Sequence, residues 1–269
     1  MTHPPPRRSD AAIPSVQLVT LWIGDRLGPV ERACLRSALR HGHRVAVYAY
    51  SSLEGVPDGV ELRDAAAILP EDAIIRHKNG SPALFSNRFR YELQRLGLGT
   101  WIDCDVYFVA PLREPGDYIM GDQGGGTIAT GVLRLPAESP LLADLRKLFD
   151  ERTVPPWLAW RPRIAAHLRR LATGRAELGK MPWGSAGPEA LTWLARKYGL
   201  ADMALPASRL YPVPWTAAGW LLDPARSLES VVRSDTIAVH LWNERLRGLD
   251  LAAAPPGSFA ARLLAEGAA

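Results

Sequence analysis

The amino-terminal part of the chain alternates between two hydrophobic patterns, and this alternation restricts the possible folds more than any other feature. Residues 17–23 (QLVTLWI) and 44–50 (RVAVYAY) are short runs rich in β-branched and aromatic residues. Between them, Val30, Cys34 and Ala38 recur at the interval of a helix. A buried strand, a helix and a second buried strand in this order predict an α/β fold with a Rossmann-like sheet and flanking helices.

The rest of the chain continues with strands and helices of ordinary length. The predicted strands cover 100–109, 127–135 and 236–241, and the predicted helices cover 81–97, 139–151, 157–172 and 188–198. A length of 269 residues fits one α/β domain. We therefore expect a flexible leader over 1–14, one domain over 15–250, and a tail with a short helix over 251–269.

Composition excludes several classes of protein. Hydrophobic residues make up 47% of the chain, which is too many for a disordered protein, and the net charge of +4 comes without a strongly basic stretch. We therefore expect no nucleic-acid partner. No apolar run reaches the roughly 18 residues that span a bilayer, and no secretory signal is evident, so we expect a cytoplasmic protein. Its two cysteines, Cys34 and Cys104, are expected to stay reduced.

Two aspartates interrupt the apolar run at 100–109. Asp103 and Asp105 stand at positions i and i+2, so in an extended segment their carboxylates would project from the same side and repel each other. A divalent cation that carries a diphosphate would relieve this repulsion, because hard oxygen ligands suit Mg²⁺ and Mn²⁺. The alternative is a polar strand end in solvent.

Several further motifs accompany this pair, in a fixed order. They are SNRFR at 86–90, WGSAGPEALT at 183–192, YPVPW at 211–215 and AVHLWN at 238–243. Together with the aspartates they resemble glycosyltransferase family 32 in the broad sense, in particular the α-1,4-galactosyl and α-1,4-N-acetylglucosaminyl transferases and their bacterial capsule and lipopolysaccharide relatives. The resemblance covers most of residues 17–245.

This resemblance implies a GT-A-type domain that transfers a hexose or N-acetylhexosamine, with retention of configuration, from a nucleotide sugar to a glycan or glycolipid. It implies a UDP-sugar donor, a surface-polysaccharide pathway and a Mn²⁺ or Mg²⁺ ion. Carried over by position, Asp105 and His240 would ligate the metal, and Asp103 would contact both the metal and the donor. An imidazole among carboxylates favours Mn²⁺ over Mg²⁺.

The resemblance also assigns residues to the donor. Asn87 and Arg90 would hold the donor sugar, Trp22 would lie near the nucleotide base, and Trp242 would direct its indole at the departing phosphate. Catalysis of this kind needs fixed cations and hydrogen-bond donors for the developing negative charge, which Arg90, Trp242 and the metal would supply. Asp103 and Asp105 complete the expected catalytic set through the metal and the donor that they contact. Structural roles are the alternative: a solvated helix face for Asn87 and Arg90, and core packing for Trp22. For His240, the structural alternative is a hydrogen-bonded histidine in the core.

Two other functions remain open. One is a catalytically silent module that binds a nucleotide sugar or a glycan on the same fold. The other is a Mg²⁺-dependent phosphatase of the haloacid-dehalogenase type, which also places an Asp-x-Asp pair after an apolar strand but requires it near the start of the fold. The arginine-rich helix predicted over 157–172 adds a candidate for peripheral contact with the inner face of an anionic membrane.

Overall fold

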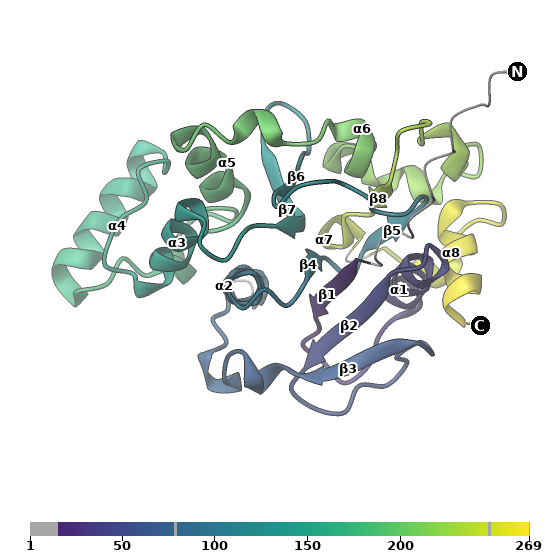
Figure 1. Ribbon diagram of the computed structural model, residues 1–269, viewed down its shortest axis with the longest axis horizontal. Helices are drawn as coiled ribbons and strands as arrows, with labels where there is room; N and C mark the ends of the chain where they lie inside the picture. Colours follow the sequence, from purple (N-terminus) through teal and green to yellow (C-terminus); the bar gives the residue numbers. More distant parts are fainter. Residues whose placement is uncertain (1–15, 78–79, 247–248, 269) are drawn as a thin grey trace, which may run out of the picture.

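A computed structural model describes residues 16–77, 80–246 and 249–268. Its centre is a six-stranded sheet in the order β3-β2-β1-β4-β7-β6 (Figure 1). The strands in chain order are β1 (Gln17–Leu21), β2 (Arg44–Ala49), β3 (Val60–Asp64), β4 (Thr100–Ile102), β6 (Ile119–Asp122) and β7 (Ile128–Arg134). Strands β3, β2, β1 and β4 run parallel, whereas β7 is antiparallel to both β4 and β6. The predicted α/β fold, with a Rossmann-like sheet and flanking helices, is confirmed.

Helices cover both faces of this sheet because the central strands are apolar on both sides. In β1, Leu18 contributes to the core shared with helix α1 (Pro29–Arg40), whereas Val19 and Leu21 contribute to the core shared with helix α2 (Ala83–Arg95). A strand buried on both faces is the pattern expected inside an α/β sheet.

The strand order places a switch point between β1 and β4. The chain leaves β1 through α1 to reach β2 on one side, and returns through α2 to β4 on the other side of β1. At such a point the loops that follow the two strands diverge and leave a crevice, where α/β proteins commonly bind ligands. Trp22 follows β1 and Asp103 follows β4, so both lie at this edge.

The segment 100–109 is not the single strand that the sequence predicts. It divides into β4 and β5 (Val106–Phe108), separated by a turn at Asp103–Asp105, and β5 pairs antiparallel with β8 (Ala238–His240) in a separate two-stranded sheet. The prediction that Asp103 and Asp105 project from the same side of an extended strand is therefore wrong, because a turn carries both carboxylates. The turn changes the direction of the chain where it leaves the main sheet.

The remaining helices pack around these two sheets. They are α3 (Pro140–Lys147), α4 (Trp160–Thr173), α5 (Pro188–Lys197), α6 (Ala207–Leu210), α7 (Asn243–Leu246) and α8 (Phe259–Ala268). Figure 1 shows α1 and α8 side by side at one end of the molecule and α4 at the opposite end. The close approach of Gly267 to the backbone of Pro29 explains the first arrangement, since a Cβ at Gly267 would collide with that backbone.

Helix α2 buries its apolar face, with Phe85, Phe89 and Leu93, and it also buries most of its polar face. Asn87, Arg90 and Gln94, the face expected in solvent if structural, are all buried, while Leu96 just after the helix is exposed. The expected leader over 1–14 lies outside the described residues. Among the described helices, none combines the length and hydrophobicity that crossing a bilayer requires.

Candidate metal centre and donor site

Three side chains from distant parts of the sequence converge beside the switch point. Asp103 and Asp105 come from the turn between β4 and β5, and His240 ends β8. His240 Nε2 lies 3.5 Å from Asp103 Oδ2 and 3.5 Å from Asp105 Oδ1. The ligand atoms of the three residues all lie within 4.8 Å of one another. The predicted convergence of the acidic pair and the imidazole is therefore present.

The remaining oxygen of each carboxylate is held by a neighbour. Asp103 Oδ1 accepts a hydrogen bond from Trp101 Nε1 at 2.8 Å and pairs with Arg90 Nη2 at 3.1 Å. Asp105 Oδ2 accepts one from the backbone N–H of Asn243 at 2.7 Å. Each carboxylate thus has one fixed oxygen and one that faces His240, which is how outer residues orient the ligands of a metal site.

Gly131 in β7 provides the space for this cluster. A Cβ atom at this position would lie 2.8 Å from His240 Cδ2 and 3.2 Å from Asp103 Oδ2. The carbonyl of Gly131 also accepts a hydrogen bond from the Asp103 backbone N–H at 2.7 Å. Only a residue without a side chain lets β7 approach the turn this closely.

The electrostatics of the cluster shift the pKa of one carboxylate down and the pKa of the imidazole up. Burial raises the pKa of Asp103, but Arg90, His240 and Trp101 together outweigh it and lower this pKa to about 2. Burial likewise lowers the pKa of His240, but Asp105 and Asp103 outweigh it and raise this pKa above 6.5. A cation among these three side chains would therefore compete with a proton on His240.

The donor set suits a hard or borderline divalent ion. Two carboxylate oxygens and one imidazole nitrogen are ligands that Mn²⁺ and Mg²⁺ accept, and the imidazole favours Mn²⁺. His240 Nδ1 accepts a hydrogen bond from the Trp242 backbone N–H at 3.3 Å. In the neutral ring this contact favours the proton on Nε2, the atom that faces the carboxylates, so a cation at Nε2 has to displace that proton.

The arginine assigned to the donor sugar is engaged elsewhere. Arg90 is buried, pairs with Asp103, donates to the carbonyls of Thr130 and Ser86, and lies with its guanidinium carbon 4.6 Å from the centre of the Trp101 ring. These contacts leave it as a residue that orients Asp103. They use three of its five N–H groups, so a contact with a donor sugar would have to come from the remaining two.

Trp242 is also engaged in a way that the sequence does not reveal. Its indole Nε1 donates to the carbonyl of Val213 at 2.8 Å, so the hydrogen expected to face a departing phosphate is already used. Its ring packs edge-on against His240 with the centroids 4.3 Å apart. In this structure Trp242 is a wall of the metal centre, and its backbone, at φ 62°, adopts the left-handed conformation.

Asn87 and Trp22 retain polar groups that are available to a ligand. Asn87 lies one helical turn before Arg90, and its side-chain amide has no hydrogen-bond partner among the described residues, although the amide keeps some contact with solvent. A Cβ at Gly187 would lie 2.9 Å from its Nδ2, so the segment before α5 abuts it closely. Trp22 Nε1 is buried and likewise lacks an acceptor among the residues that the structure describes. Buried polar groups without partners are uncommon and call for an explanation, such as a missing ligand.

Two further residues of the centre are not identified from the sequence. Glu31, in the first turn of α1, is buried and accepts a hydrogen bond from Asn243 Nδ2 at 2.6 Å. The same Asn243 donates its backbone N–H to Asp105, so Glu31 supports a metal ligand through one intermediate. Burial raises the pKa of Glu31. From sequence, this glutamate has the ordinary appearance of an acid at a helix N-terminus.

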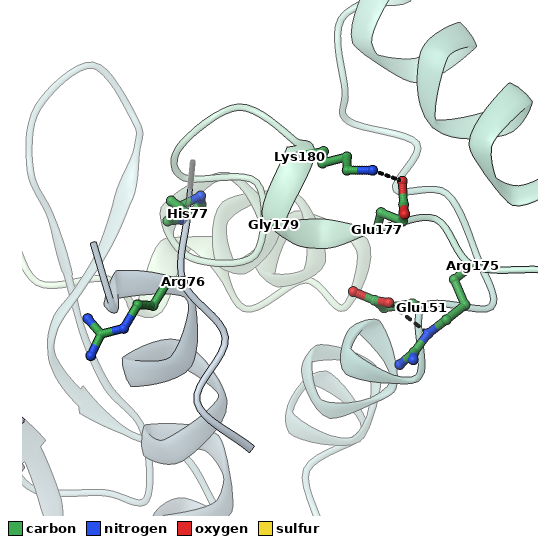
Figure 2. A pocket seen from close by; sticks show the side chains of 7 residues that line it. All are labelled: Arg76, His77, Glu151, Arg175, Glu177, Gly179 and Lys180. Atoms are coloured by element: carbon green, nitrogen blue, oxygen red, sulfur yellow. Dashed lines mark hydrogen bonds and ion pairs between the residues drawn. The ribbon is translucent and has the colours of Figure 1, made fainter. Parts of the chain in front are cut away.

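A cavity of about 410 Å³ lies apart from this centre, between the segment at Arg76 and the segments at Glu151 and 175–180 (Figure 2). Figure 2 shows two ion pairs in its lining, Lys180 with Glu177 and Arg175 with Glu151, whereas Arg76 is drawn without a pairing to the other lining residues. None of the metal-centre residues lines it.

No known protein-family model matches the chain. No curated protein matches its sequence. Among solved structures, the PaToxG glycosyltransferase is similar to this chain over 68% of each chain, with 12% sequence identity and a TM-score of 0.42. The function therefore has to be inferred from the chain's own site.

Proposed function

We propose that this chain is a metal-dependent glycosyltransferase. It would transfer a hexose or an N-acetylhexosamine from a UDP-sugar to a glycan or lipid-linked glycan, with retention of configuration, as the motifs similar to family 32 imply. The observation that carries the proposal is the convergence of Asp103, Asp105 and His240 within 4.8 Å at the switch point of a Rossmann-like sheet. Crevices at such points bind nucleotides, and a diphosphate needs a cation there.

The contacts of the residues indicate a different role for each of them. A divalent ion held by Asp103, Asp105 and His240 would act as a Lewis acid toward the diphosphate leaving group. Arg90 and Trp101 fix Asp103, and Asn243 fixes Asp105, so that little reorganisation is needed when the donor binds.

On the donor side, the amide of Asn87 offers both donor and acceptor atoms for sugar hydroxyls. The indole of Trp22 offers an apolar face and an unused N–H near the nucleotide. Both belong to elements that end or pack at the switch point, and both carry polar groups that the described residues leave without partners.

The test is release of UDP from donor sugars without an acceptor. Wild-type protein is incubated with UDP-galactose, UDP-glucose or UDP-N-acetylgalactosamine, with Mn²⁺, Mg²⁺ or a chelator, and UDP is measured. We expect Mn²⁺-dependent release from at least one donor, and thermal stabilisation by the same donor. Asp105→Asn keeps an oxygen for the Asn243 N–H but removes the charge, so release should fall about 100-fold or more.

Asp58→Asn is the matched control, because Asp58 is exposed in the loop between β2 and β3 and should leave release unchanged. If a donor stabilises the protein and no condition releases UDP, the chain is a binding module. If no donor stabilises it and none is cleaved, the assignment to nucleotide-sugar chemistry is wrong.

A further inference from the structure

Helix α4 presents its apolar side chains to solvent and not to the core. Trp160, Ile164, Leu168 and Leu171 are 64%, 51%, 62% and 79% exposed, and they recur at intervals of four and three residues. Residues so spaced lie on one side of a helix, so they form a continuous stripe. The inner side of the helix is anchored by Ala166, which is fully buried. Large exposed apolar patches mark interaction sites.

The stripe is surrounded by positive charge. Helix α4 has four arginines, at 161, 163, 169 and 170, and no aspartate or glutamate. On the helical projection Arg161 and Arg163 flank the stripe on opposite sides. Among the residues that the structure describes, neither forms an ion pair: Arg161 stacks on Trp160, and Arg163 donates to the carbonyl of Pro156. Their charge is available to an external partner.

The helix is connected to the proposed donor site. Trp157, just before α4, donates its indole N–H to the carbonyl of Ser185 at 2.8 Å. Ser185 belongs to the segment whose Gly187 abuts the amide of Asn87. That segment also carries Trp183, which is 58% exposed. Trp157 thus links the start of α4 to the segment that abuts Asn87.

We propose that α4 is an interfacial helix that binds an anionic phospholipid bilayer. Its stripe would enter the boundary between headgroups and acyl chains, while Arg161 and Arg163 would remain among the anionic headgroups. The position of α4 at the edge of the molecule, away from both sheets, leaves the stripe accessible to a flat surface (Figure 1). A second copy fits less well, because pairing two stripes would bring two clusters of arginines together without acidic partners.

The experiment is co-flotation of the full chain with vesicles of phosphatidylcholine alone or with 30% phosphatidylglycerol. We expect binding to the anionic vesicles, weakened by salt, and much less binding to the neutral ones. Binding needs neither donor nor cation, so it is measured with a chelator present and is independent of the proposed transferase activity.

Two variants separate the apolar and the charged contributions. Leu168→Ser with Leu171→Ser removes apolar contact, and about tenfold weaker binding is expected for each leucine that fully enters the membrane. Arg161→Gln with Arg163→Gln removes two charges, each worth about fivefold. All four side chains are exposed, so both variants should melt near the wild-type temperature.

The controls are Met203→Ser, an exposed apolar residue outside α4, and Arg44→Gln, an exposed arginine at the start of β2. Both should bind as wild type does. Absence of flotation with anionic vesicles overturns the proposal, as does unchanged binding of the leucine variant. A concentration-dependent dimer that the leucine variant abolishes, without vesicle binding, would assign the stripe to a second copy instead.

Discussion

Gly131→Ala tests the metal centre without removing any of its ligands. The added methyl would lie 2.8 Å from His240 Cδ2 and 2.9 Å from His240 Nε2. Because carbon atoms pack at about 3.5 Å or more, the imidazole has to move by more than about half an ångström. The Trp242 ring, 4.3 Å from the imidazole between centroids, restricts that movement. Ligand sites tolerate displacements of only about 0.5 Å, so the Mn²⁺ affinity should fall about 10- to 100-fold.

Overpacking of this kind costs about 1–3 kcal/mol, which predicts a melting temperature lower by a few degrees and an intact fold. Isothermal titration with Mn²⁺ measures the affinity, and circular dichroism measures the fold and the melt. Gly219→Ala is the control, because a Cβ at Gly219 meets no atom within 4 Å. If Gly131→Ala binds Mn²⁺ as tightly as wild type does, the cation does not lie among these side chains.

Three further predictions concern the same centre. The pKa of His240 is raised in the folded chain, so the stability that its protonation contributes is complete below pH 6.5 and is lost as pH rises through the folded pKa. Thermal melts of chelator-treated protein at increasing pH should show this loss of stability. The variant His240→Gln should abolish the pH dependence. Mn²⁺ competes with the same proton, so its affinity, measured by titration calorimetry, should rise with pH over that range. Glu31→Ala leaves the Asn243 amide without its acceptor and should weaken Mn²⁺ binding several-fold. Glu31→Gln keeps an acceptor oxygen and should retain most of the affinity. Equal Mn²⁺ affinities in the wild type and in both variants would show that Glu31 does not support the centre.

The parts of the fold that local periodicity controls could be predicted from the sequence. The helix at Pro29–Arg40 and its flanking strands follow from the spacing of apolar residues. Strand β3 is not predicted, because its sequence VELRD mixes charges with apolar residues and its side chains are mostly exposed. It is a strand because β2 offers it a full ladder of partners, from Val45 with Val60 to Ala49 with Asp64. Such pairing is tertiary information.

The polar face of α2 shows a second limit of sequence patterns. Periodicity separates apolar from polar positions, but it does not distinguish water from a polar interior. Gln94 is buried because its amide donates to the carbonyl of Gly99 and accepts from the N–H of Leu135. Arg90 is buried because a carboxylate and two carbonyls surround its guanidinium. Apart from the Ser86 carbonyl, these partners lie outside the helix, so the helix sequence alone does not reveal them.

The metal centre depends on a register that local sequence does not determine. Strands β5 and β8 have three residues each, and their pairing sets Val106 opposite His240, next to Asp105. A slip of one residue would turn the imidazole to the other face of this small sheet. Asp105 opposes such a slip, because its carbonyl accepts from the N–H of Leu241 at 2.9 Å and its carboxylate accepts from the N–H of Asn243. The residue that would offer an oxygen to a cation therefore also holds the strand that carries His240. For this reason Asp105→Asn, and not Asp105→Ala, separates the loss of charge from the loss of register.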